Sequence, residues 1–84
     1  MEKDTVRFIT INYVLEIFED LYLRDINEDL ELDKYPDSER LKIKIVIDVL
    51  DMLNISNEIN KGGIKQCKTL GDILETLYTI TQAK

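Results

Sequence analysis

The residues of this chain that could carry chemistry centre on a serine in a turn. Ser38 follows Pro36 and Asp37, and the most apolar stretch of the chain begins shortly after it. Pro36 fixes an extended approach to the turn, so Asp37 and Ser38 fall where the N-cap of a helix is expected. The Ser38 hydroxyl is therefore the candidate functional atom. A purely structural role competes with this, because Asp or Ser at an N-cap stabilises a helix by about 1 kcal/mol.

Composition excludes most other catalytic chemistry. The chain has no histidine and a single cysteine, Cys67, which excludes imidazole acid–base catalysis, Ser-His or Cys-His nucleophiles and thiolate metal clusters. Asp25, Asn27 and Asp29 alternate as in a calcium loop, but the glycine and the glutamate that such a loop needs at its sixth and twelfth positions are missing. We therefore expect no catalytic residues and no metal site, and Cys67 as a small core residue.

Size and charge set the broad class of the protein. A chain of 84 residues closes one hydrophobic core, so residues 1–84 are expected to form a single domain. Seventeen acidic and eleven basic residues give a net charge of −6, which disfavours nucleic acid and suits a basic protein partner. No stretch approaches the ~20 apolar residues of a membrane span, and the N-terminus lacks the apolar run of a signal peptide. We expect a cytoplasmic monomer.

The segment from Arg40 to Asn54 decides the fold, since it fits two periodicities. Apolar residues at alternate positions near its start are typical of a half-buried strand. Polar residues at steps of four and three instead define one face of a helix, and the alternation breaks at Val46. We interpret the segment as a helix. Lys42 then falls on its apolar side, where we expect the long stem to lie along apolar surface while the ammonium reaches water.

Two further helices complete the predicted architecture. Apolar residues at steps of three and four predict a first helix from Thr5 to about Leu21. A closing helix begins after Thr69, which forms a capping box with Asp72. The acidic connection before Ser38 has room for a helical turn after Asn27, and its apolar residues are its expected anchors to the core: Leu30, Leu32 and Tyr35. The predicted fold class is all-α, a small three- to four-helix bundle.

In this order the elements resemble the acyl carrier protein family. Asp37-Ser38 is similar to the Asp-Ser of the family's Asp-Ser-Leu signature. Glu58-Ile59 is similar to the Glu-Ile that follows the family's second helix, and the segment KTLGDILETL, residues 68–77, is similar to the closing helix. The spacing between Glu58-Ile59 and Thr69 is also usual in that family. Together these segments span most of the chain.

The resemblance implies an acyl-carrier-like bundle with a covalent cofactor. Ser38 would carry a 4′-phosphopantetheine arm through a phosphodiester, with Asp37 as the flanking motif residue, and the thiol of the arm would hold an acyl or aminoacyl group as a thioester. The partners would be a phosphopantetheinyl transferase and the acyl-transfer or synthase enzymes of fatty-acid or polyketide biosynthesis, and the carrier itself would not be an enzyme. An apolar groove would shelter the cargo, with these candidate lining residues: Ile43, Val46, Leu50, Ile59 and Ile64.

Two departures from the family pattern leave other functions open. Glu39 stands where the family has leucine after its serine, and the helix that follows begins with three basic residues where the family is acidic: Arg40, Lys42 and Lys44. A second interpretation is a small acidic helical interaction module, without a prosthetic arm, that binds a basic protein through residues 25–37. A third, supported by charge and size alone, is an immunity or antitoxin-type protein whose acidic loop masks a basic nuclease or toxin.

Overall fold

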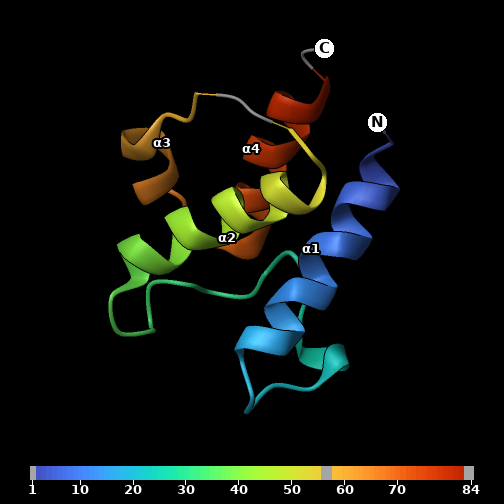
Figure 1. Cartoon of the computed structure of the whole chain (residues 1–84). Coiled ribbons are helices and arrows are strands. Elements are labelled where there is room, and N and C mark those ends of the chain that lie inside the picture. The colour runs from blue at the N-terminus through green and yellow to red at the C-terminus, as the bar shows by residue number, and fades with distance from the viewer. Residues whose placement is uncertain (1, 56–57, 83–84) are drawn as a thin grey trace.

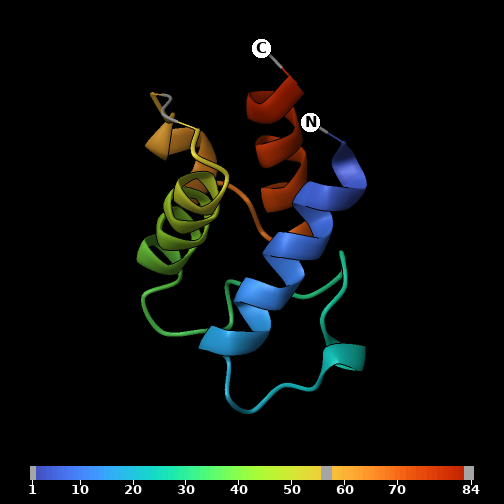
Figure 2. The same ribbon diagram turned by 45° about the vertical axis from the view of Figure 1, so that its right-hand side comes forward.

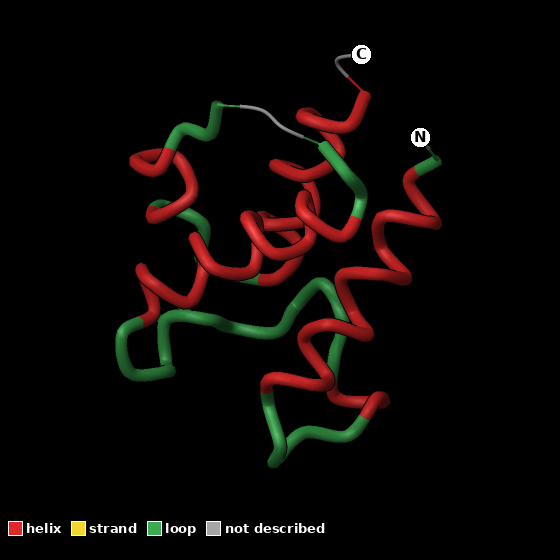
Figure 3. The backbone as a smooth tube through the Cα atoms, viewed as in Figure 1, coloured by secondary structure: helices red, strands yellow, loops and turns green. Residues whose placement is uncertain are grey.

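The computed structural model describes residues 2–55 and 58–82. This part of the chain contains four α-helices and one 3-10 turn, joined by loops (Figure 1). In chain order they are α1 (Lys3–Ile17), η1 (Leu23–Asp25), α2 (Ser38–Met52), α3 (Lys61–Lys65) and α4 (Leu70–Gln82). The described residues contain no strand, and a long connection, residues 18–37, joins α1 to α2 (Figure 3). The predicted all-α bundle is confirmed, and its short fourth helix lies in the connection before α4.

The middle of the core is formed by α2, which packs against the other three α-helices. Figure 2 shows α1 and α4 side by side, with α2 and α3 together across from them. Ile45, Val46 and Val49 of α2 are fully buried, and removing such a side chain from water contributes about 1.5–3 kcal/mol. The segment is therefore a helix, as the polar periodicity predicted, and its apolar side is buried from Lys42 to Leu50.

The first helix ends earlier than the periodicity predicts. Its last residue is Ile17, four before Leu21, and Phe18 leaves the helix with an extended backbone while its N–H bonds the Val14 carbonyl at 3.0 Å. The Phe18 ring then packs against Tyr35, with 4.5 Å between the ring centroids. The predicted boundary was wrong because an aromatic contact with a distant part of the chain is not visible in local periodicity.

The helical turn of the acidic connection also lies elsewhere than predicted. It occupies η1, where the Tyr22 N–H bonds the Asp25 carboxylate at 3.1 Å. After Asn27 the chain instead forms a tight turn, because the Asn27 side-chain oxygen accepts the N–H of Asp29 at 2.8 Å. Side chains of this kind compete with helix by bonding nearby backbone groups.

Backbone hydrogen bonds fasten the acidic connection to the start of α4. The Leu32 N–H bonds the Lys68 carbonyl, and the Leu70 N–H bonds the Leu30 carbonyl, both at 2.9 Å. Leu30 and Leu32 are buried, as predicted for anchors, and Ile26 is a third buried anchor that the sequence pattern did not single out. The connection is thus a fixed part of the core although it contains almost no helix.

Gly71 makes a third backbone bond of this kind and depends on having no side chain. Its N–H bonds the Glu28 carbonyl at 2.9 Å, and a Cβ at position 71 would lie 2.9 Å from that same oxygen. A glycine near the start of a helix normally lowers helix stability. Here it permits the close approach of two backbones.

The capping box predicted at the start of α4 is confirmed. The Asp72 carboxylate accepts the backbone N–H groups of Lys68 at 2.9 Å and Thr69 at 3.3 Å, and the Thr69 hydroxyl accepts the Asp72 N–H at 3.3 Å. The backbone hydrogen bond from Lys68, followed by that from Thr69, lowers the pKa of Asp72 below its ordinary value. The carboxylate therefore stabilises both the helix and the junction that receives the acidic connection.

This capping predicts a pH-dependent effect of Asp72→Asn. A carboxyl group whose pKa is lowered by folding stabilises the protein above its ordinary pKa of 3.8 and loses that contribution as the pH falls through its folded value. At pH 7 we expect Asp72→Asn to reduce the free energy of unfolding by about 0.3–1 kcal/mol. Below the folded pKa the difference from wild type should shrink, as measured by urea unfolding at pH 7 and at low pH.

Glu75→Gln is the matched control, since it removes the same charge from an exposed position of α4. It should change stability little at either pH. A deficit of Asp72→Asn that stays the same at both pH values would contradict the role given to the charged carboxylate.

Candidate functional site

Ser38 is the first residue of α2, and Asp37 before it holds an unusual backbone conformation. Asp37 has φ 52° and ψ 41°, in the left-handed region, and its side chain makes no capping hydrogen bond. A capping residue normally has an extended backbone from which its side chain reaches the first N–H groups of the helix. The helix thus begins where the sequence predicts, but the predicted side-chain cap is not formed.

The first turn of α2 therefore presents unused donors. The N–H groups of Ser38, Glu39 and Arg40 precede the first intrahelical bond, which joins the Leu41 N–H to the Asp37 carbonyl at 3.0 Å. Within the described residues, these three N–H groups and the half-buried Ser38 hydroxyl have no hydrogen-bond partner in the protein. The start of α2 is consequently a place where an added negative group finds donors.

An open groove of about 720 Å³ lies beside Ser38. It is bounded by the end of the acidic connection, the first turns of α2 and the end of α3. Six of its lining residues are charged, and the full set is Asp33, Tyr35, Asp37, Ser38, Glu39, Arg40, Lys42, Ile43 and Lys65. The groove is therefore strongly polar, with both signs of charge on its walls.

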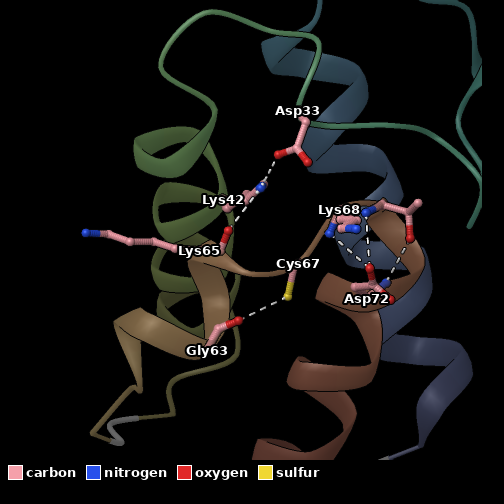
Figure 4. A network of polar contacts seen from close by, with 8 residues as sticks. Asp33, Lys42, Gly63, Lys65, Cys67, Lys68 and Asp72 are labelled. Atoms are coloured by element: carbon pink, nitrogen blue, oxygen red, sulfur yellow. Dashed lines mark hydrogen bonds and ion pairs between the residues drawn. The ribbon is translucent and has the colours of Figure 1, made fainter.

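The ammonium of Lys42 lies inside the structure rather than in water. Its side chain is 2% exposed, and its Nζ forms an ion pair with the Asp33 carboxylate and donates to the Lys65 carbonyl at 3.2 Å (Figure 4). The expectation of an ammonium reaching water was wrong, because the acidic connection crosses the start of α2 and covers it. A buried charge is tolerated when it is paired and hydrogen-bonded, and this pairing joins the connection, α2 and α3.

The residues expected to line one apolar groove do not come together. Ile43 lines the groove beside Ser38, whereas Val46 is fully buried in the core. Leu50 and Ile59 line a different hollow of about 400 Å³ near the end of α2, and Ile64 lines a third hollow between α3 and α4. The expectation of one shared groove was wrong, since Ile43, Val46 and Leu50 lie on different turns of α2 and Ile59 and Ile64 lie beyond that helix.

The second lysine of α2 is also paired. Lys44 donates to the Asp48 carboxylate at 2.8 Å, one turn along the helix, and the Tyr13 hydroxyl of α1 donates to the same carboxylate. The bond from Lys44 and then that from Tyr13 lower the pKa of Asp48, while burial and then the bond to Asp48 raise the pKa of Tyr13. Of the three cations at the start of α2, Arg40 alone lacks an ion pair within the described residues.

A second surface combines exposed apolar and acidic side chains. Phe8, Tyr22 and Leu23 are large and exposed, and a hollow of about 470 Å³ lies between α1 and η1 next to Phe8 and Leu23. Asp29 and Glu31 are exposed on the adjoining connection. The periodicity of α1 did not reveal this surface, because Phe8 lies at the edge of the apolar stripe.

Cys67 lies in the core as predicted. It is buried, and its Sγ lies 3.7 Å from both the Gly63 carbonyl and the Thr76 hydroxyl oxygen. None of the helices in the described ranges, 2–55 and 58–82, has the length and apolar composition that crossing a bilayer requires.

Comparison of the chain with protein-family models, with curated proteins and with solved structures finds no match. The resemblance to acyl carrier proteins therefore rests on the residues and their order.

Replacing Asp33 and replacing Lys42 should lower the free energy of unfolding by different amounts, because only one of the two changes leaves a buried charge without its partner. Asp33→Asn leaves the Lys42 ammonium inside the protein without its carboxylate, and we expect a loss of about 2 kcal/mol, below the ~3–5 kcal/mol typical of a fully buried pair because Asp33 is 55% exposed. Lys42→Met keeps the stem and removes the charge, so it should cost less than about 1 kcal/mol. Urea unfolding of both variants measures the difference.

The double variant sharpens this test, since Asp33→Asn should cost almost nothing once Lys42 is Met. Asp29→Asn is the control for a nearby exposed charge and should stay within about 0.5 kcal/mol of wild type. Equal losses for Asp33→Asn and Lys42→Met would show that pairing is not what holds the ammonium inside.

Proposed function

We propose that this protein is a carrier, which holds an acyl or aminoacyl group as a thioester on a 4′-phosphopantetheine arm attached to Ser38. One observation carries the proposal. Ser38 begins a 15-residue helix at the edge of an open groove, and its hydroxyl has no hydrogen-bond partner among the described residues. A carrier needs such an accessible hydroxyl and no catalytic residues of its own, because the partner enzymes supply the chemistry.

The residues around Ser38 suit a phosphodiester. The unused N–H groups of the first turn of α2 and the dipole of the helix favour a negative group on the hydroxyl. Arg40 and Lys65 line the same groove and add positive charge. The arm supplies the thiol that forms the thioester, while this chain supplies its point of attachment and its surroundings.

Attachment follows from the chemistry of the hydroxyl. Ser38 Oγ attacks the pantetheine-bearing phosphorus of coenzyme A in the active site of a phosphopantetheinyl transferase. A new oxygen–phosphorus bond forms, the bond to the departing adenosine 3′,5′-bisphosphate breaks, and the hydroxyl proton passes to the transferase. No residue of this chain needs to act as a base in that step.

The ion pairs of α2 reduce the basic character of the start of this helix, which departs from the acidic helix of the carrier family. Lys42 and Lys44 are neutralised by Asp33 and Asp48, so their charges contribute little to the surface that a partner enzyme meets. Asp37 and Glu39 are exposed beside Ser38. Together with Arg40 and Lys65 on the groove wall they leave two negative and two positive charges without an ion pair among the described lining residues, so the surroundings of the attachment point are less basic than the sequence order suggests.

The direct test is the intact mass of the protein after incubation with coenzyme A and a broad-specificity phosphopantetheinyl transferase. We expect one phosphopantetheine on the wild type and none on Ser38→Ala. Ser38→Ala should remain within about 0.5 kcal/mol of wild-type stability, because the hydroxyl makes no capping bond. Ser56→Ala is the control, since Ser56 is the one other serine of the chain.

The proposal fails if the folded wild type stays unmodified with several transferases. It also fails if Ser38→Ala accepts the arm as readily as the wild type.

A second candidate function is a small acidic helical interaction module that binds a basic protein and has no prosthetic arm. The exposed side chains of Phe8, Tyr22 and Leu23 beside the acidic connection favour it. A large exposed apolar group flanked by acidic residues suits a partner that offers apolar and basic side chains together.

The module predicts a specific effect of charge changes on the connection. Asp29→Asn combined with Glu31→Gln should slow association with a basic partner and weaken its salt dependence if the module is correct. Asp33 is left unchanged, because it pairs with Lys42. The measurement is the association rate of a partner isolated on immobilised unmodified protein, at low and at high salt.

The matched control removes two exposed charges elsewhere, Glu58→Gln with Glu75→Gln. For the module, this control and Ser38→Ala should both bind as wild type does. Loss of partner binding in Ser38→Ala would instead favour the carrier.

A further inference from the structure

We infer that the cargo of this carrier is a short acyl or aminoacyl group rather than a long alkyl chain, and that Lys42 sets this limit. The inference rests on the proposed attachment at Ser38 and concerns what the adjacent groove accepts. It follows from the charge on the groove walls and from the position of the Lys42 ammonium.

The walls of the groove offer little to an alkyl chain. Among the described residues that line it, Ile43 is the one aliphatic side chain, and six others carry charge. An alkyl chain gains free energy by leaving water for apolar surroundings. Against charged walls it would gain little and would displace water from groups that need it.

Lys42 blocks the way from the groove to the apolar interior. Its Nζ is held by Asp33 from the connection and by the Lys65 carbonyl from α3 (Figure 4). Ile45 and Val46 lie one turn further on the same side of α2 and are fully buried. A chain that entered the core here would have to separate the ion pair and leave an ammonium among apolar side chains.

A second apolar surface lies in the hollow near the end of α2. Ile47, which lines it, is nine residues beyond Ser38, or about 13 Å along the helix axis. A cargo that lodged there would stabilise the protein in proportion to its length. A dependence of stability on chain length therefore reports such lodging as well as entry past Lys42.

The test loads wild type and Lys42→Met with acetyl, butyryl, octanoyl and lauroyl groups from the corresponding coenzyme A thioesters, and checks each product by intact mass. The readout is the midpoint of thermal unfolding against chain length. For the wild type we expect the acetyl and lauroyl forms to agree within about 1 °C. For Lys42→Met, whose groove floor is apolar, we expect a rise of about 5 °C from acetyl to lauroyl.

Lys65→Met is the control, because Lys65 lines the groove with an exposed side chain. It should respond to chain length as the wild type does. A second readout is the rate at which hydroxylamine cleaves the thioester: it should be independent of chain length in the wild type and fall with chain length in Lys42→Met, as a sheltered thioester reacts more slowly.

The outcomes separate this inference from the carrier proposal. A wild type that no transferase loads overturns the carrier and with it the inference. A wild type that is loaded and becomes more stable with longer chains overturns the inference and leaves the carrier intact. If neither Lys42→Met nor Lys42→Leu responds to chain length while the wild type stays flat, the limit on the cargo is not set by Lys42.

Discussion

The structure around Ser38 depends on the backbone pairing between residues 28–32 and the start of α4. Ordering a connection that contains little helix costs about 1–2 kcal/mol of backbone entropy per residue, and hydrogen bonds to the Lys68 carbonyl and from the Leu70 and Gly71 N–H groups oppose that cost. Since Leu32 is fixed in this way, the next residue, Asp33, is placed against Lys42. The turn that follows then delivers Ser38 to the edge of the groove.

Pairing of charges inside the fold changes how the sequence should be interpreted. Along the chain, Lys42 and Lys44 make the start of α2 basic, but Asp33 and Asp48 neutralise them from the connection and from the next helical turn. Among the described groove residues that belong to α2 or to the turn before it, three charged side chains have no ion pair: Asp37, Glu39 and Arg40. Counting charged residues along the sequence therefore overstates the positive charge that the start of α2 presents to a partner.

Local patterns predicted the parts of the fold that local physics determines. Periodicity identified α1, α2 and α4 but not the short α3, and the Thr69–Asp72 capping box follows from residue types three positions apart. The end of α1 and the burial of the Lys42 ammonium depend instead on Tyr35 and Asp33, which come from another segment. The left-handed Asp37 that leaves α2 without a side-chain cap was equally out of reach, because Asp is also a common capping residue.

In the proposed carrier, the residue after Ser38 would affect which enzymes bind rather than the reactivity of the hydroxyl. Glu39 occupies the first turn of α2 and is exposed, and a carboxylate there is favoured by the helix dipole. Exchanging leucine for glutamate at such a position changes the surface that an enzyme touches, while the Ser38 hydroxyl, its neighbouring N–H groups and the groove stay as they are. Under the carrier proposal, the departure at Glu39 is thus compatible with an esterified Ser38, and the partner enzymes would recognise an acidic rather than an apolar side chain beside it.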